Sequence, residues 1–138
     1  MGRSLERLFN PRAVAVIGAS QNIKTISGQP VWALARHGFT GKLYPVNPKY
    51  DRIGDLVCYP DVEALPEGVD LAIVATPAAI VASTLRALAK KGVRAAVVFS
   101  SGFSETGPEG AALEQALRQA IADTGMRVLG PNCLGFIN

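Results

Sequence analysis

AVAVIGAS, residues 13–20, is the stretch from which the fold of this chain is predicted. The apolar run from Ala13 to Ile17 stops at Gly18 and continues into small residues, as a strand buried on both faces does when it reaches a turn. Four later stretches repeat this pattern, because each is apolar and each runs directly into a turn-forming loop. They are Leu43 to Val46, Leu71 to Ala75, Ala95 to Phe99 and Arg127 to Leu129.

Helical signals fill most of the segments between these strands, with apolar residues on one face and turn-forming residues at the ends. The expected helices run from Ser27 or Gly28 to His37-Gly38, from about Ala78 to Lys91, and from a first turn containing Pro108 to a stop at Gly125. Strand and helix therefore alternate. This order predicts an α/β, Rossmann-like, doubly wound parallel sheet of five strands, with right-handed crossovers and helices on both faces.

Two segments carry weaker signals. Between Tyr50 and Val69 there is room for only a short helix, near Asp61 to Leu65. Residues Ser4 to Phe9 have the pattern of an amphipathic turn, which Asn10-Pro11 ends.

Composition limits the classes of protein to which the chain can belong. Its 138 residues, 49% of them hydrophobic, suit a single domain of ordinary size. No apolar run could span a bilayer and no signal peptide is recognisable, so a cytoplasmic protein is expected. The net charge of +3 comes without a dense basic cluster, which favours an anionic small molecule over nucleic acid. Cys58 and Cys133 form no CxxC pair, so neither a zinc site nor a dithiol is expected, and no metal.

The loops that follow the five strands point to a binding site. In an open parallel sheet, ligands bind outside the carboxyl ends of the strands, and these loops would line one crevice there. They begin with Gly18-Ala19-Ser20, Asn47-Pro48-Lys49, Thr76-Pro77-Ala78, Ser100-Ser101-Gly102 and Gly130-Pro131-Asn132.

The sequences of the first two loops help to distinguish between NAD, NADP and coenzyme A as possible ligands. The loop after Gly18 lacks the second and third glycines of the dinucleotide fingerprint GxGxxG, although a phosphate could still meet backbone N–H groups near Ser27 and Gly28, at the start of a helix. An NAD site usually has Asp or Glu at the end of the second strand, where this chain has Lys49. A lysine prefers a phosphorylated ribose, which NADP and coenzyme A (CoA) both provide. An NADP-dependent oxidoreductase domain therefore remains an alternative, opposed by the missing glycines.

Several short motifs together resemble a known family. In order along the chain they are LFNP (8–11), AVAVIGAS (13–20), YPVNPK (44–49), ATP (75–77), SSGFSE (100–105) and GPNCLG (130–135). This series resembles the CoA-binding domain of NDP-forming acyl-CoA synthetases, a family that includes ADP-forming acetate–CoA ligases and is related to the α subunit of succinyl-CoA synthetase. Each motif alone is weak, but the series covers nearly the whole chain.

The resemblance implies that CoA lies across the strand ends. The residues implied to receive its phosphates and nucleotide are Gly18, Ala19, Ser20, Ser27 and Gly28. Those implied to flank the adenosine are Asn47, Pro48 and Lys49, with Lys49 near the 3′-phosphate. The path of the pantetheine arm would be lined by Thr76, Pro77, Ser100, Ser101, Gly102 and Phe103, and Asn132 would lie near the thioester end. Glu105 has two open roles, a ligand contact or a solvated residue before a helix.

No catalytic residue is predicted. The sequence places no activating base beside Cys133. His37 falls at a helix C-terminus, where histidine commonly interacts favourably with the negative end of the helix dipole. In the resembling ligases a phosphohistidine and an ATP-grasp domain carry the chemistry. We therefore expect residues 1–138 to be the N-terminal CoA-binding part of a longer ligase, inactive alone. A stand-alone CoA-binding protein and a CoA-sensing domain of a protein acetyltransferase are alternatives. The acyl substrate, the choice of ADP or GDP and the oligomeric state stay open.

Overall fold

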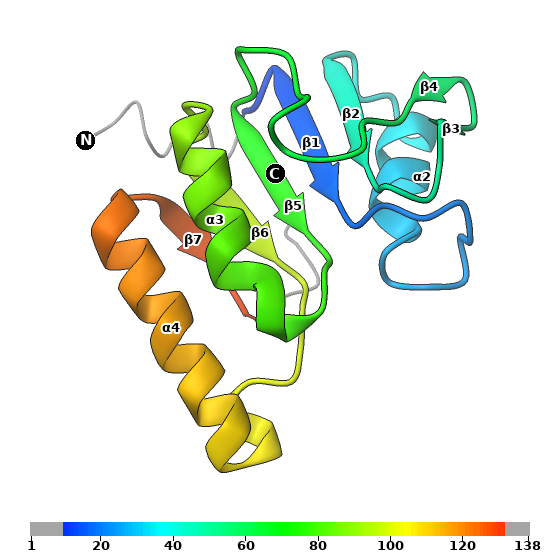
Figure 1. Ribbon diagram of the computed structural model, residues 1–138. Coiled ribbons are helices and arrows are strands. Elements are labelled where there is room, and N and C mark those ends of the chain that lie inside the picture. Colours follow the sequence, from blue (N-terminus) through cyan, green and yellow to red (C-terminus); the bar gives the residue numbers. More distant parts are fainter. Residues whose placement is uncertain (1–9, 132–138) are drawn as a thin grey trace.

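A parallel sheet of five strands forms the centre of the protein (Figure 1). Its strands are β1 (Ala13–Ile17), β2 (Lys42–Val46), β5 (Leu71–Val74), β6 (Ala95–Val98) and β7 (Arg127–Leu129). In this computed structural model, which describes residues 10–131, the strands lie in the order β2-β1-β5-β6-β7 and every neighbouring pair is parallel. The predicted strands are confirmed, with one end shifted by a single residue in β2, β5 and β6.

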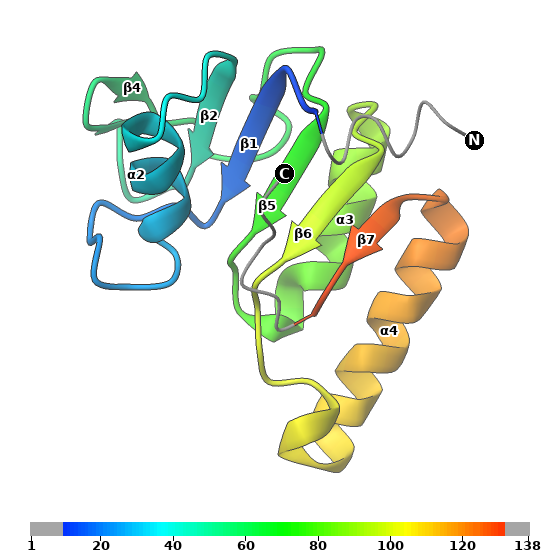
Figure 2. The ribbon, with the colours of Figure 1, turned by 180° about the vertical axis from the view of Figure 1, so that it is seen from behind.

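Helices cover both faces of the sheet. α2 (Gln29–Arg36) lies on one face, and α3 (Val81–Lys90) and α4 (Pro108–Thr124) lie on the other (Figures 1 and 2). Side chains of a strand alternate between the faces. In β1, Val14 belongs to the core that includes Val31 of α2, while Ala15 belongs to the core that includes Leu85 of α3. The doubly wound α/β sheet is therefore confirmed.

The helix ends follow the signals in the sequence. A short 3₁₀ turn, η1 (Ala78–Ile80), comes directly before α3, so the predicted start near Ala78 is confirmed. α4 begins at Pro108 and stops at Gly125, which has a left-handed φ of 69°. His37 follows the last turn of α2 and donates its backbone N–H to the Ala33 carbonyl. Among residues 10–131, no helix combines the length and the apolar character needed to cross a bilayer.

The predicted short helix at Asp61 to Leu65 is wrong. The segment forms a single turn, in which Asp61 Oδ1 accepts the N–H of Ala64 at 2.9 Å and Leu65 donates to the Val62 carbonyl at 3.1 Å. The reason lies in its flanking residues. Pro66 has no N–H to extend a helix and disfavours helical geometry at the residue before it.

A β-hairpin that the sequence analysis missed precedes this turn. Its strands β3 (Arg52–Ile53) and β4 (Leu56–Val57) are antiparallel. The signal was Gly54-Asp55 between Arg52-Ile53 and Leu56-Val57, but strands of two residues are too short for a period of two to show.

The open edge of β2 is largely blocked. Pro45 has no N–H to offer a further strand, and its carbonyl accepts the N–H of Tyr59 at 2.9 Å. Tyr59 in turn accepts the N–H of Asn47 at 2.9 Å. These bonds fix the chain where β2 ends and the second of the candidate loops begins.

Candidate functional site

The loop after β1 packs directly on the loops of its two neighbouring strands. The backbone N–H groups of Gly18 and Ala19 both donate to the Val46 carbonyl of β2, at 2.8 and 3.2 Å. On the β5 side, Gly18 has φ +84°, and a Cβ added to it would lie 2.8 Å from the carbonyl oxygen of Ala75. Glycine is required here because a backbone atom of the next loop occupies the place of a side chain.

Four of the five predicted phosphate-binding residues have their N–H groups engaged inside the protein. Besides Gly18 and Ala19, Ser20 donates its N–H to the Ser27 carbonyl at 3.2 Å. At the start of α2, the N–H groups of Gly28 and Gln29 donate to the Thr25 carbonyl at 3.1 and 3.2 Å. The Thr25 hydroxyl lies 3.2 Å from the Gly28 nitrogen. A phosphate bound at this helix N-terminus would have to replace Thr25, a residue that the sequence analysis did not consider.

Asn47 joins the loop after β2 to the loop after β1. Its Nδ2 donates to the Ala19 carbonyl at 2.9 Å, and its Oδ1 accepts the N–H of Lys49 at 2.9 Å. Both ends of the Asn47 amide are thus used within the protein. Pro48 and Lys49 are exposed beside it.

Two further contacts, unforeseen from the sequence, fasten the same loops. Gln21 Nε2 donates to the Arg52 carbonyl at 2.8 Å, and the hydroxyls of Ser20 and Tyr50 lie 3.5 Å apart. The two loops predicted to hold a nucleotide are therefore held to each other before any ligand arrives.

The loops after β5 and β6 are also joined. Ser100 is buried and donates its hydroxyl to the Thr76 carbonyl at 2.6 Å. Ser101 and Pro77 are exposed, and Gly102 has φ +98°. Together with the contacts above, this bond makes one continuous row of loops at the carboxyl ends of β2, β1, β5 and β6.

The side chain of Phe103 lies in the core. It is only 1% exposed and belongs to the core on the α3 and α4 side of the sheet. Its ring therefore cannot line a ligand path in this structure, which corrects the expectation for that side chain. In this loop, Ser101 and Gly102 remain candidates to line the path.

Glu105 has a partner within its own loop. Its Oε1 accepts the N–H of Gly102 at 2.6 Å, the contact by which an acidic side chain reaches back to the first N–H of a helical turn. This bond is the main reason that the pKa of Glu105 lies below its ordinary value. Of the two open roles for Glu105, the structure favours a local, structural one.

These loops suit a ligand that lies across several strand ends, and comparison with known proteins identifies the family. A family model described as a CoA binding domain matches residues 12–138. The chain belongs to this family. The expectation of a CoA-binding domain like that of NDP-forming acyl-CoA synthetases is thereby confirmed.

Curated and solved relatives agree with this assignment. Over 134 residues, this CoA-binding domain is 46% identical to ADP-forming acetate–CoA ligase II of Archaeoglobus fulgidus, a match that covers 97% of this chain and 20% of that protein. It is 40% identical to the α subunit of ADP-forming acetate–CoA ligase II of Pyrococcus furiosus, covering 97% of this chain and 29% of the subunit. Dinucleotide-forming acetyl-coenzyme A synthetase 1 of Ca. Korarchaeum cryptofilum superposes with a TM-score of 0.85 at 45% identity, covering 93% of this chain and 28% of that one. The chain thus spans less than a third of each relative's length.

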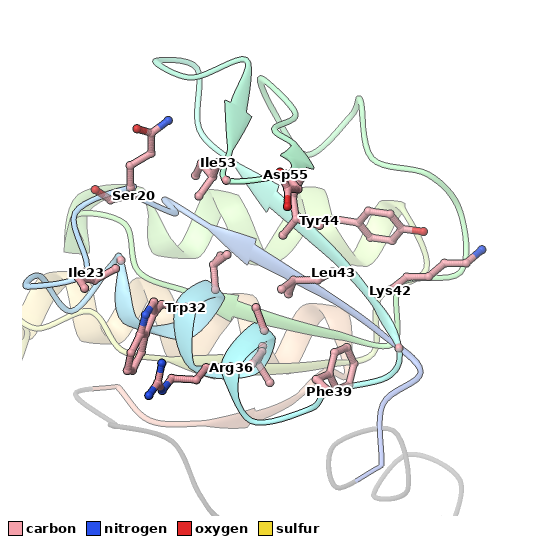
Figure 3. Close-up of a pocket in the computed structure, with 18 residues that line it drawn as sticks. Ser20, Ile23, Trp32, Arg36, Phe39, Lys42, Leu43, Tyr44, Ile53 and Asp55 are labelled. Carbon is pink, nitrogen blue, oxygen red and sulfur yellow. The ribbon is translucent and has the colours of Figure 1, made fainter.

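A groove of about 1010 Å³ lies along α2 of the CoA-binding domain and reaches the loop after β1 at one end (Figure 3). It runs between α2, β2 and the β3–β4 hairpin. Trp32 and Arg36 point to the same side of α2, with the guanidinium carbon 5.3 Å from the indole centroid. Of the predicted ligand residues, Ser20 and Gly28 line this groove, whereas Lys49 does not. The groove and the row of loops are therefore neighbouring features that meet at the start of α2.

Some of the predictions concern residues outside the range 10–131. Asn132 and Cys133 lie outside the described residues, as does the turn expected at Ser4 to Phe9. Cys58 is buried, which raises the pKa of its thiol, and its Sγ lies 3.5 Å from the Asn47 carbonyl oxygen. Within residues 10–131, no group of three or more His, Cys, Asp and Glu side chains is placed to hold a metal ion.

Proposed function

We propose that this CoA-binding domain holds CoA across the carboxyl ends of β2, β1, β5 and β6, as one part of a longer NDP-forming acyl-CoA synthetase. The observation that carries the proposal is the continuous row of loops, joined by Asn47 at one end and by Ser100 at the other. CoA is a long ligand with a charged nucleotide and a thin pantetheine arm, which suits an extended site better than a single deep pocket. A cytoplasmic location and the other domains of such a ligase as partners belong to the same proposal.

Lys49 is the residue proposed for the ribose 3′-phosphate. Asn47 fixes its backbone, and within residues 10–131 its side chain has no ion-pair partner. The ammonium group is therefore available to an anion at the nucleotide end of the site. Asn47 and Pro48 would support the adenosine from the same turn.

The other proposed contacts follow from the order of the loops. Ser20, Ser27 and Gly28 would approach the phosphates after Thr25 has left the helix N-terminus. Gly18 and Ala19 would hold the loop in place through their backbone bonds to the Val46 carbonyl. The pantetheine arm would pass Thr76, Pro77, Ser101 and Gly102, with Ser100 and Phe103 holding that surface from below. Asn132 is proposed for the thioester end.

The domain's proposed part in the reaction is to bind and orient the thiol substrate. In an acyl-CoA synthetase the sulfur of CoA attacks the carbonyl carbon of an activated acyl group and displaces the activating group. The sulfur must therefore be held where that carbon is presented. Extended contacts to the nucleotide supply binding energy far from the sulfur. The residues described here would thus position CoA, and residues 1–138 alone are expected to form no acyl-CoA from ATP, acetate and CoA.

Replacing Lys49 by alanine is expected to weaken CoA binding by roughly 1 kcal/mol, about fivefold, because an exposed charge-assisted contact is lost. Calorimetric titration should show little change for dephospho-CoA, which lacks the 3′-phosphate. Lys42→Ala is the matched control, since it removes an exposed lysine at the opposite end of β2. Equal losses for both ligands would show that Lys49 does not read the 3′-phosphate.

A further inference from the structure

The loop after β6 is anchored to other segments on both sides of one peptide unit, Ser101–Gly102. Phe103 is buried in the core, and Ser100 is bonded to the Thr76 carbonyl. Gly110 of α4 lies so close to the Phe103 carbonyl that a Cβ there would overlap it. Between these anchors, Ser101 is exposed and Gly102 is half-buried. The Ser101–Gly102 peptide therefore depends on something other than burial for its orientation.

The side chain of Glu105 forms a hydrogen bond to this peptide. Glu105 lies in the short turn η2 (Ser104–Thr106), and its exposed carboxylate accepts the N–H of Gly102, two residues before that turn, at 2.6 Å. A bond of this length to an ionised carboxylate is of the stronger, charge-assisted kind. The same bond is the largest cause of the lowered pKa of Glu105.

The direction of one N–H fixes the direction of the carbonyl on the other side of the peptide. In a planar trans peptide the two groups point in opposite directions, so the Ser101 carbonyl points away from Glu105. Glycine at position 102, with φ +98°, offers little steric resistance to rotation of this peptide. Without the carboxylate, donor and acceptor could exchange places at the surface of the loop.

We propose that Glu105 is a positioning residue for the pantetheine arm of CoA: by holding the Gly102 N–H, it fixes the Ser101 carbonyl as an acceptor on the loop surface. The arm carries two amide groups whose N–H donors need such acceptors. Glu105 itself does not touch the ligand. This inference rests on the proposed function, because it assumes that the arm passes this loop.

The test compares two ligands and three variants in the full 138-residue chain. CoA carries the pantetheine arm, and adenosine 3′,5′-bisphosphate is the nucleotide end without it. Glu105→Ala removes the acceptor, whereas Glu105→Gln removes the charge and keeps an acceptor oxygen. Glu109→Ala is the matched control, because it removes a neighbouring exposed carboxylate in the first turn of α4.

Calorimetry should show that Glu105→Ala weakens CoA binding roughly three- to tenfold, as expected for one lost hydrogen bond, and leaves the bisphosphate unchanged. Glu105→Gln should restore most of the CoA affinity, and Glu109→Ala should change neither ligand. By NMR hydrogen exchange without ligand, the Gly102 amide should be protected in the unmodified chain and in Glu105→Gln, and exposed in Glu105→Ala.

Several results would overturn the inference. They are an unprotected Gly102 amide in the unmodified chain, unchanged CoA affinity in Glu105→Ala, an equal loss for both ligands, or a Gln variant as weak as the Ala variant. Failure of the proposed function is distinguishable, since the unmodified chain would then bind no CoA at all.

Discussion

Phe103→Ala is expected to lower the free energy of unfolding by about 3–5 kcal/mol, the usual cost of truncating a buried phenylalanine. The ring is 1% exposed and packs in the same core as Leu85 and Leu117, so its removal leaves a cavity beneath α4. Because natural domains have only about 5–15 kcal/mol of stability, this loss is a large share of the total. Urea unfolding followed by circular dichroism measures it.

A conservative variant separates this core role from a ligand contact. Phe103→Leu keeps an apolar side chain, so it should cost less stability than Phe103→Ala and leave CoA affinity near that of the unmodified chain under folding conditions. The opposite pattern, with stability unchanged in both variants and CoA binding lost, would show that the ring faces the ligand.

Gly110→Ala is the second change with a large expected effect. Helix propensity alone predicts that alanine at this position of α4 stabilises the protein by about 1 kcal/mol. The structure predicts the opposite sign, because the added Cβ would overlap the Phe103 carbonyl oxygen and crowd the Thr106 hydroxyl. Overpacking of this kind typically costs about 1–3 kcal/mol, and here backbone must move to relieve it.

The same unfolding measurement tests this prediction. Ala112→Gly, at an exposed position of the same helix, is the control and should lose about 1 kcal/mol by propensity alone. A Gly110→Ala variant more stable than the unmodified chain would mean that α4 does not rest on the loop after β6.

The sheet could be predicted because each of its strands has a recognisable pattern in the local sequence. A strand buried on both faces is a continuous apolar run, and each run here ends in residues that no longer fit a strand, such as Gly18 and Asn47. The order of strand and helix then leaves few topologies. The segment from Tyr50 to Val69 could not be predicted in the same way. Its hairpin has strands too short for a pattern, and Pro66 limits the expected helix to a single turn.

The site was predicted less completely, because its details depend on contacts between distant residues. The positions of the loops follow from the strands, and so do candidates such as Lys49. Three details depend on how the loops pack together: the Thr25 carbonyl accepts the N–H groups at the start of α2, Gln21 reaches the Arg52 carbonyl, and Phe103 is buried. No spacing in the sequence carries that information, and a motif such as SSGFSE contains both a core residue and surface residues.

We propose that the row of loops at the strand ends binds CoA. Calorimetric titration of the 138-residue chain with CoA and, separately, with NADP tests it most directly, because both ligands carry a phosphorylated ribose and differ in the rest of the molecule. We expect CoA to bind more tightly, since the loop after β1 lacks the glycines of a dinucleotide site and the loops after β5 and β6 offer a path for pantetheine. Tighter binding of NADP, or no binding of CoA, would contradict it.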